Sequence, residues 1–256
     1  MNINITTITT TPFPHVVIDN VLPEQLVSDL QEEITNIPSK QFDYIINPFE
    51  KKKVLKGAII KEQKLPTKTL ELFKYLESKE FISKLENTFN TKLIVDSERH
   101  FHGIHKIDEC GDLLDIHLDS SIHPVLNLKK KLTVGLYLSK NWNDLCQGEL
   151  ELWEGTSSVD YLNNYPSLIK LGKRYDCRSN RMIIFENTDK AYHGQPNPIK
   201  NISSDSIRIF LTLSYLSLET PYNNRCRALF VKGLDEEDNL EKQELRLKRA
   251  SGTWKH

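Results

Sequence analysis

The hydrophobic pattern changes along the chain from helical spacing to strand spacing. Apolar residues recur every three to four positions over about 23–37 and again over about 67–90, which predicts two amphipathic helical regions. The second region is expected to break near Ser78. From about 92 to 218 the pattern becomes a series of short strands between turn residues, with no helices between them. This order is typical of a β-sandwich or β-barrel that carries helices on the outside of a sheet.

The same pattern predicts one domain over residues 1–218. The part over about 12–91 is expected to supply helical support and the part over about 92–218 a β core, so the fold class is α+β, mainly β. Residues 219–256 are dense in Glu, Lys and Arg, which predicts a charged helical extension held by charge pairs four residues apart. A solvated terminal helix is favoured there over a helix that binds a partner.

Composition excludes several classes of protein. The chain has 256 residues and a formal net charge of −1, which gives no electrostatic case for binding nucleic acid or an anionic membrane. No apolar run approaches the ~18 residues of a membrane span, and the N-terminus lacks the basic flank and apolar core of a secretory signal. The four cysteines are scattered, without a Cys-x-x-Cys pair, which favours reduced thiols and a cytoplasmic location.

The residues best suited to bind a metal ion lie in one strand-like stretch, 114–119. Its sequence LDIHLD alternates apolar and polar positions, so the polar side chains share one face. An imidazole and a carboxylate two residues apart, such as His117 and Asp119, can bind one metal ion. With His193 as a third ligand, the set would be the two-histidine, one-carboxylate triad of non-haem iron oxygenases. A bare His-x-Asp also occurs by chance, and the competing interpretation is a solvated strand face.

Two further residues lie where they could serve the same pocket. Tyr137 shares a strand face with small and polar residues, which suggests a neighbouring cavity, although a half-buried tyrosine is the simpler interpretation. Arg208 opens the last strand of the core, and its guanidinium suits a planar carboxylate. A surface arginine at the end of a strand is the competing interpretation there. His193 lies in a turn-rich segment after an apolar strand, where it could share this pocket.

A second group of histidines competes as a metal site. His100, His102 and His105 lie close together in the sequence. No Cys or carboxylate is placed to complete a tetrahedral zinc site with them. Histidines on an edge strand or near the mouth of the pocket are therefore the favoured interpretation.

Several motifs occur in an order that marks a known family. They are the entry strand PFPHVVIDN at 12–20, HLD at 117–119, LYLSKNW at 136–142, GELEL at 148–152, NRMIIF at 180–185 and YHG at 192–194. On these motifs the chain resembles the prolyl-4-hydroxylase-like branch of the Fe(II)- and 2-oxoglutarate-dependent oxygenases, over about 12–218. It departs from the family pattern at Gln147, which replaces the first glycine of a GGxL motif. The loop from His193 to Arg208 is also longer than in the shortest members.

The resemblance implies a double-stranded β-helix, or jelly roll, with N-terminal helices packed on its major sheet. It implies Fe(II) held by His117, Asp119 and His193, and 2-oxoglutarate as cosubstrate with its distal carboxylate held by Arg208 and Tyr137. Ascorbate is a candidate additional cofactor. The implied reaction hydroxylates an unactivated C–H bond and decarboxylates 2-oxoglutarate to succinate and CO2. Peptidyl proline is the best-known substrate of this branch.

Other functions stay open at this point. A cupin-like module could bind a metal ion without redox turnover, and a jelly-roll sugar-binding or interaction protein could carry the triad by chance. The substrate could be a small molecule or a peptide or protein, because the sequence shows no substrate-recognition motif. The loop over 155–178 is equally consistent with a lid and with a surface insertion, and the sequence does not indicate an oligomeric state.

Overall fold

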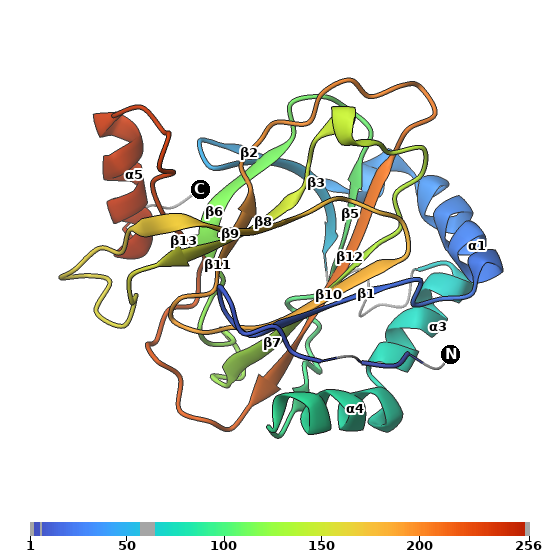
Figure 1. The fold of residues 1–256 in the computed structure, drawn as a ribbon, viewed down its shortest axis with the longest axis horizontal. Helices are drawn as coiled ribbons and strands as arrows, with labels where there is room; N and C mark the ends of the chain where they lie inside the picture. Colours follow the sequence, from blue (N-terminus) through green and yellow to red (C-terminus); the bar gives the residue numbers. More distant parts are fainter. Residues whose placement is uncertain (1–2, 6, 57–64, 254–256) are drawn as a thin grey trace.

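The computed structural model describes residues 3–5, 7–56 and 65–253, and the elements below lie in these ranges (Figure 1). Thirteen strands are present there: β1 (His15–Asp19), β2 (Asp43–Asn47), β3 (Glu50–Lys56), β4 (Ile94–Val95), β5 (Gly103–Ile107), β6 (Leu113–Leu118), β7 (Lys129–Tyr137), β8 (Leu150–Gly155), β9 (Leu168–Tyr175), β10 (Arg181–Glu186), β11 (Tyr192–Gln195), β12 (Arg208–Ser217) and β13 (Leu229–Phe230). The helices are α1 (Glu24–Thr35), α3 (Thr67–Leu76), α4 (Lys79–Phe89) and α5 (Leu240–Ala250), with short 3₁₀ turns at Ser39–Gln41 and Asp144–Cys146.

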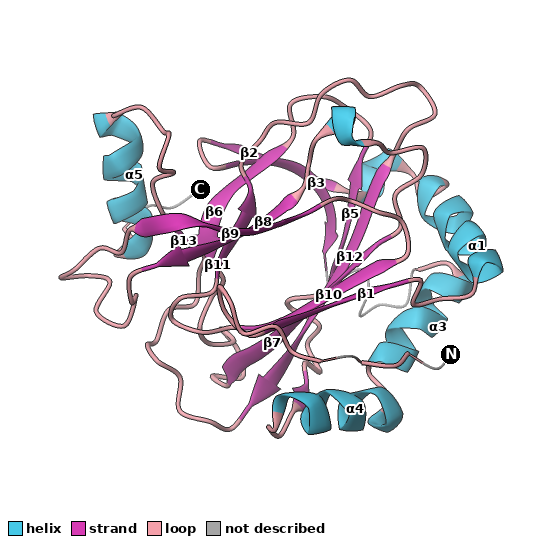
Figure 2. Ribbon diagram, viewed as in Figure 1, coloured by secondary structure: helices cyan, strands magenta, loops and turns pink. Residues whose placement is uncertain are grey.

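The strands form one antiparallel sheet that curls on itself (Figure 2). Neighbouring strands follow the order β1-β10-β7-β12-β5-β3-β6-β11-β8-β9. Strand β3 pairs with both β5 and β6, so it joins the half that contains β7 and β12 to the half that contains β6 and β11. This arrangement confirms the predicted mainly-β fold with a jelly-roll core.

Helices α1, α3 and α4 cover the outer face of the sheet half that contains β7, as the sequence predicted (Figure 1). Alternation along β7 explains the contact. Leu132, Val134 and Leu136 point outward into the core shared with the helices. Tyr137 points inward into a second core, and Thr133 lines an internal cavity. Because residues two apart in a strand share a face, one strand serves both layers.

The predicted break in the second helical region is confirmed at Ser78. The Ser78 hydroxyl accepts a hydrogen bond from the backbone N–H of Phe81 at 3.3 Å and so caps the start of α4. A side-chain cap satisfies an N–H group that has no partner within the helix. Helix α3 therefore ends at Leu76, and α4 begins as a separate helix at Lys79.

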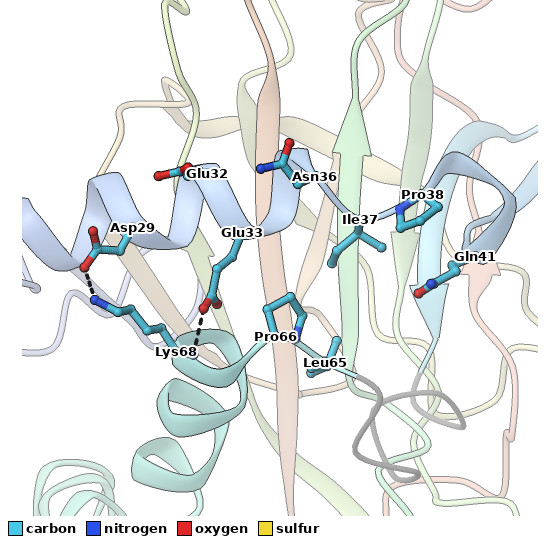
Figure 3. A pocket seen from close by; sticks show the side chains of 10 residues that line it. All are labelled: Asp29, Glu32, Glu33, Asn36, Ile37, Pro38, Gln41, Leu65, Pro66 and Lys68. Carbon is cyan, nitrogen blue, oxygen red and sulfur yellow. Dashed lines mark hydrogen bonds and ion pairs between the residues drawn. The ribbon is translucent and has the colours of Figure 1, made fainter.

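Glu33 of α1 plays the corresponding role for α3 from across a hollow between the two helices (Figure 3). Its carboxylate accepts hydrogen bonds from the backbone N–H groups of Lys68 at 3.0 Å and Thr69 at 2.8 Å. The Thr69 hydroxyl donates to the same carboxylate at 2.8 Å. Pro66, which precedes α3, provides no side-chain cap. Glu33 therefore fixes the start of α3 and ties it to α1.

Replacing Glu33 with alanine is expected to lower the free energy of unfolding by about 1–2 kcal/mol, as for the loss of a helix cap. Urea denaturation measures this change. Glu32→Ala is the matched control, because Glu32 is exposed on the same helix, and it should change stability by less than about 0.5 kcal/mol. Equal destabilisation by both variants would contradict the capping role.

The segment after residue 218 contains the predicted helix, but it also joins the sheet. Strand β13 pairs with β6, placing Leu229 opposite Leu118 and Phe230 opposite His117. In α5, Arg246 is 3% exposed and its guanidinium binds the Glu236 carboxylate at 2.5 Å. The extension therefore packs against the core instead of lying free in solvent. No helix in the described ranges is long and apolar enough to cross a membrane.

Candidate metal centre

The two candidate histidine ligands lie on neighbouring strands. Strand β11 pairs antiparallel with β6 in a register that places His193 directly opposite His117. Their ring centroids are 4.4 Å apart. Asp119 lies just beyond the end of β6, two residues after His117. The β6–β11 pairing therefore brings together the three residues, called the triad below, and their ligand atoms all lie within 4.8 Å of one another.

The hydrogen bonds of the triad leave the right atoms available for a metal ion. Nδ1 of His117 donates to the Asp115 carbonyl, and Nδ1 of His193 donates to the Ala191 carbonyl, each at 2.9 Å. Because a carbonyl can only accept, each Nδ1 carries the proton and each Nε2 keeps its lone pair. Fixing the tautomer through the second ring nitrogen is the usual arrangement for a histidine ligand.

Distances between the ligand atoms also fit one ion. Oδ1 of Asp119 lies 3.7 Å from Nε2 of His117, and Oδ2 lies 3.9 Å from Nε2 of His193. Two atoms that each bind one ion at about 2.0–2.2 Å can be at most ~4.4 Å apart. Each of these Asp119–histidine distances is within that limit, and a mixed nitrogen and oxygen set of this kind is typical of a divalent metal site.

Electrostatics keep these donors in the ionisation state that a metal needs. Burial lowers the pKa of His193 to about 4, so its imidazole is neutral at pH 7. Burial would raise the pKa of Asp119, but the charge of Lys130 and the neighbouring histidines outweigh it and hold that pKa well below its usual range. The carboxylate is therefore ionised. Neither His193 nor Asp119 therefore has to lose a proton before it binds a metal.

Tyr137 and Arg208, the other two predicted site residues, line the same cavity as the triad. The cavity has a volume of about 240 Å³. Arg208 is 5% exposed and begins β12. A guanidinium NH2 donates to the Tyr137 hydroxyl at 3.4 Å, and Nε donates to Sγ of Cys177 at 3.2 Å. The three triad residues, Tyr137 and Arg208 therefore all line one cavity.

The side-chain environment of Arg208 leaves it ready for an anion. Tyr137 and Phe210 flank the guanidinium, with their ring centroids 5.2 and 5.6 Å from its central carbon. No carboxylate of the described residues lies within ion-pair distance of it. Gly135 makes room for this aromatic wall, because a Cβ atom there would lie 2.3 Å from the Phe210 ring. A buried cation without a protein anion is typical of a site for an anionic ligand.

Several residues at the site were missed by the sequence analysis. Lys130 and Thr133 both bind Asp119, and Cys177 binds Arg208. Lys130 and Thr133 precede Tyr137 on β7, and Thr133 has the same strand parity as Tyr137, so the alternation of β7 could have identified Thr133. No local signal distinguishes Cys177, because its partner is remote in the sequence.

The histidines of the 100–105 segment form no metal site with one another. His102 is buried against Glu77 at 3.1 Å, whereas His105 lines the cavity beside Phe210. His100 lines the outer groove beside the triad. Within the described ranges, the triad is the one group of three or more potential ligands close enough to hold an ion. The interpretation of these histidines as residues near the mouth of the pocket therefore fits His100 and His105, whereas His102 is buried away from the pocket.

Comparison with known proteins gives a family match over part of the chain. Residues 100–213 match the model of the 2OG-Fe(II) oxygenase superfamily. The fold is similar to a Pseudomonas putida prolyl-4-hydroxylase, with 12% identity, a TM-score of 0.56, and coverage of 79% of this chain and 91% of that one. The fold is also similar to a Trichoplax adhaerens prolyl hydroxylase, solved with a hypoxia inducible factor oxygen degradation domain peptide fragment. The identity is 20%, the TM-score is 0.56, and the match covers 79% of this chain and 83% of that one. For a Phytophthora capsici prolyl 4-hydroxylase, the identity is 21%, the TM-score is 0.52, and the match covers 79% of this chain and 58% of that one.

At these identities the solved structures establish similarity of fold. No match to a curated protein sequence was found. The family match covers the segment that contains the whole triad, Tyr137 and Arg208. It agrees with the order of motifs in the sequence and with a site whose donors fit iron(II). Residues 100–213 therefore match the 2OG-Fe(II) oxygenase superfamily, and the chain has a fold similar to that of the prolyl-4-hydroxylases.

Proposed function

We propose that this chain hydroxylates a C–H bond of a peptide substrate, with peptidyl proline as the first candidate. In this proposal the triad holds iron(II), and Arg208 and Tyr137 hold the distal carboxylate of 2-oxoglutarate. Bound iron(II) and 2-oxoglutarate supply the oxidising chemistry, in which one oxygen atom of O2 enters the substrate and 2-oxoglutarate becomes succinate and CO2. The observation that carries the proposal is the convergence of all five residues on one cavity of about 240 Å³.

The protein side chains have distinct tasks in this scheme. The triad supplies two imidazoles and one carboxylate, and leaves other coordination positions for the cosubstrate. Arg208 offers a planar fork of donors that suits a carboxylate, and the Tyr137 hydroxyl, which accepts from Arg208, can donate to the same anion. Because these groups are buried, their attraction for a carboxylate is stronger than in water. The cavity thus orients 2-oxoglutarate from its distal end.

Cys177 is expected to hold Arg208 in the orientation that binds 2-oxoglutarate. The Cys177→Ala variant loses the acceptor for Nε, so the KM for 2-oxoglutarate should rise by about 2–10-fold with kcat at saturation nearly unchanged. Initial rates of succinate formation measure both constants. Cys177→Ser should restore most of the affinity, because a hydroxyl also accepts this bond. Cys146→Ala, which removes another buried thiol, is the control, and an equal effect of both alanine variants would contradict the assignment.

A groove beside the triad offers a place where a peptide substrate could bind. Its volume is about 660 Å³, and His117, Asp119 and Lys130 line it as well as the inner cavity. One side of the groove is strand β2, and residues 226–230 contribute another side. In Figure 1, β2 and the C-terminal part of the chain lie toward the same end of the sheet as β6. An extended peptide in this groove could present one side chain to the triad, because His117 and Asp119 line the groove.

Turnover of 2-oxoglutarate in the presence of candidate substrates tests the proposal. The iron-loaded protein should form succinate faster with proline-containing peptides than with free amino acids or sugars, and the peptide should gain the mass of one oxygen atom. Succinate formation stimulated by a small metabolite alone would contradict the peptide assignment. Metal binding without any succinate would favour the non-catalytic cupin-like module instead.

A further inference from the structure

Lys130 makes the closest polar contact to the triad. Its ammonium lies 2.6 Å from Oδ2 of Asp119, and its side chain is 6% exposed. The ammonium also lies 4.5 Å from the centroid of the Phe101 ring, which holds it over the carboxylate. The Thr133 hydroxyl lies 3.2 Å from the same oxygen. Two donors from β7 therefore converge on a single oxygen of Asp119.

The two oxygens of Asp119 are otherwise similarly placed. Oδ1 is 3.7 Å from Nε2 of His117, and Oδ2 is 3.9 Å from Nε2 of His193. By distance alone, both oxygens could reach an ion held by the histidines. The contacts with Lys130 and Thr133 are what distinguish them. A charge-assisted hydrogen bond to a buried ammonium is among the strongest that a carboxylate makes, so Oδ2 is the less available oxygen.

We infer that Lys130 is a positioning residue that occupies Oδ2 of Asp119 and so restricts this ligand to a single oxygen, Oδ1. The inference rests on the proposed metal set. A carboxylate can bind a metal through one or two oxygens, and a second oxygen would take a coordination position that the cosubstrate needs. Lys130 thereby weakens the hold of the triad on the metal and keeps that position open. It acts through Asp119, without being a ligand itself.

The Lys130→Met variant tests this role, because methionine keeps an unbranched apolar stem beside Phe101 but removes the charge. Two affinities are measured by titration calorimetry without turnover: that of Mn²⁺ for the apo-protein and that of 2-oxoglutarate for the Mn²⁺-loaded protein. We expect Mn²⁺ to bind roughly tenfold more tightly, because a repelling charge is lost and Oδ2 is freed. We expect 2-oxoglutarate to bind at least roughly tenfold more weakly, because a coordination position is filled.

Matched variants separate this role from an ordinary structural ion pair. Lys131→Met removes the neighbouring buried lysine, which pairs with Glu186 and Glu219 away from the triad, and should leave both affinities unchanged. Lys130→Arg retains a cation and should stay close to the wild type. Thr133→Val, a second way to release Oδ2, should shift both affinities in the same directions as Lys130→Met but less.

The possible results distinguish this inference from the proposed function. Unchanged or weaker Mn²⁺ binding in both Lys130→Met and Thr133→Val would overturn the inference and leave the metal site standing. Tighter Mn²⁺ binding with unchanged 2-oxoglutarate affinity would overturn it too, because the coordination position would then be open in both proteins. A wild-type protein that binds no Mn²⁺ would remove the proposed function and the inference together.

Discussion

Replacement of Asp119 with alanine is expected to abolish succinate formation and to weaken Mn²⁺ binding by at least roughly a hundredfold. Loss of a hydrogen-bond partner that orients a histidine ligand already costs about 10–100-fold in metal affinity, so loss of the carboxylate ligand itself should cost more. Calorimetric titration with Mn²⁺ measures the affinity, and a succinate assay measures turnover. Neither readout depends on knowing the primary substrate, provided that uncoupled turnover of 2-oxoglutarate is followed.

The same variant should remain folded but become less stable. Without Asp119 the buried ammonium of Lys130 loses its carboxylate partner, which is expected to lower the free energy of unfolding by about 1–3 kcal/mol. Urea denaturation measures this loss, and circular dichroism verifies the fold. Since domains of this kind are stable by about 5–15 kcal/mol, the fold should survive.

Asp115→Ala is the matched control for this experiment. Asp115 lies on the same strand, but its side chain points toward α5 and binds the Lys242 ammonium at 2.7 Å. The control should retain wild-type Mn²⁺ affinity, because the Asp115 carbonyl that fixes the His117 tautomer belongs to the backbone. Full turnover by Asp119→Ala, or equal loss of metal binding in both variants, would remove Asp119 from the ligand set.

Replacement of Arg208 with alanine is expected to raise the KM for 2-oxoglutarate by about 10–100-fold, with a smaller effect on kcat. Hydrogen bonds to a charged group contribute about 1.5–3 kcal/mol, and this range corresponds to the expected change in KM. Arg208→Lys should recover only part of the affinity, because an ammonium lacks the planar fork of a guanidinium. Initial rates of succinate formation over a range of 2-oxoglutarate concentrations measure the effect.

Arg174 provides the control for the Arg208 experiment. It pairs with Glu151 at 2.7 Å, its side chain is 51% exposed, and it does not line the cavity. Arg174→Ala should leave the KM for 2-oxoglutarate unchanged. If Arg208→Ala also left the KM unchanged, the distal carboxylate would have to bind another residue of the cavity.

The local parts of the fold were predictable because they depend on periodicity and on short motifs. Helical spacing identified α1 and the two helices α3 and α4, including the break at Ser78. Alternation identified β6 and β7, because a strand that separates two layers must place apolar and polar side chains on opposite faces. The order of the motifs indicated the same superfamily whose model matches residues 100–213.

Strand alternation misplaced one carboxylate and did not single out Lys130, which contacts the triad. It put Asp115 on one face with His117 and Asp119, whereas the structure places Asp115 against α5. The partner of Asp115 comes from the end of the chain, and no local pattern encodes that contact. Phe230, which pairs with the triad strand through β13, lies in a segment that composition alone marks as charged and solvated.

The sequence by itself determined the strand and helix types, the resemblance to the superfamily and the identity of the candidate ligands. Each of these depends on short segments of the chain, such as a periodic stretch or a motif of a few residues. The tertiary structure alone decided that the β6–β11 register sets His193 opposite His117, and that Lys130 and Thr133 reach Asp119 from β7. The physical reason is that contacts between distant residues depend on strand register and sheet curvature, which arise from the packing of the whole core. Local periodicity does not contain that information.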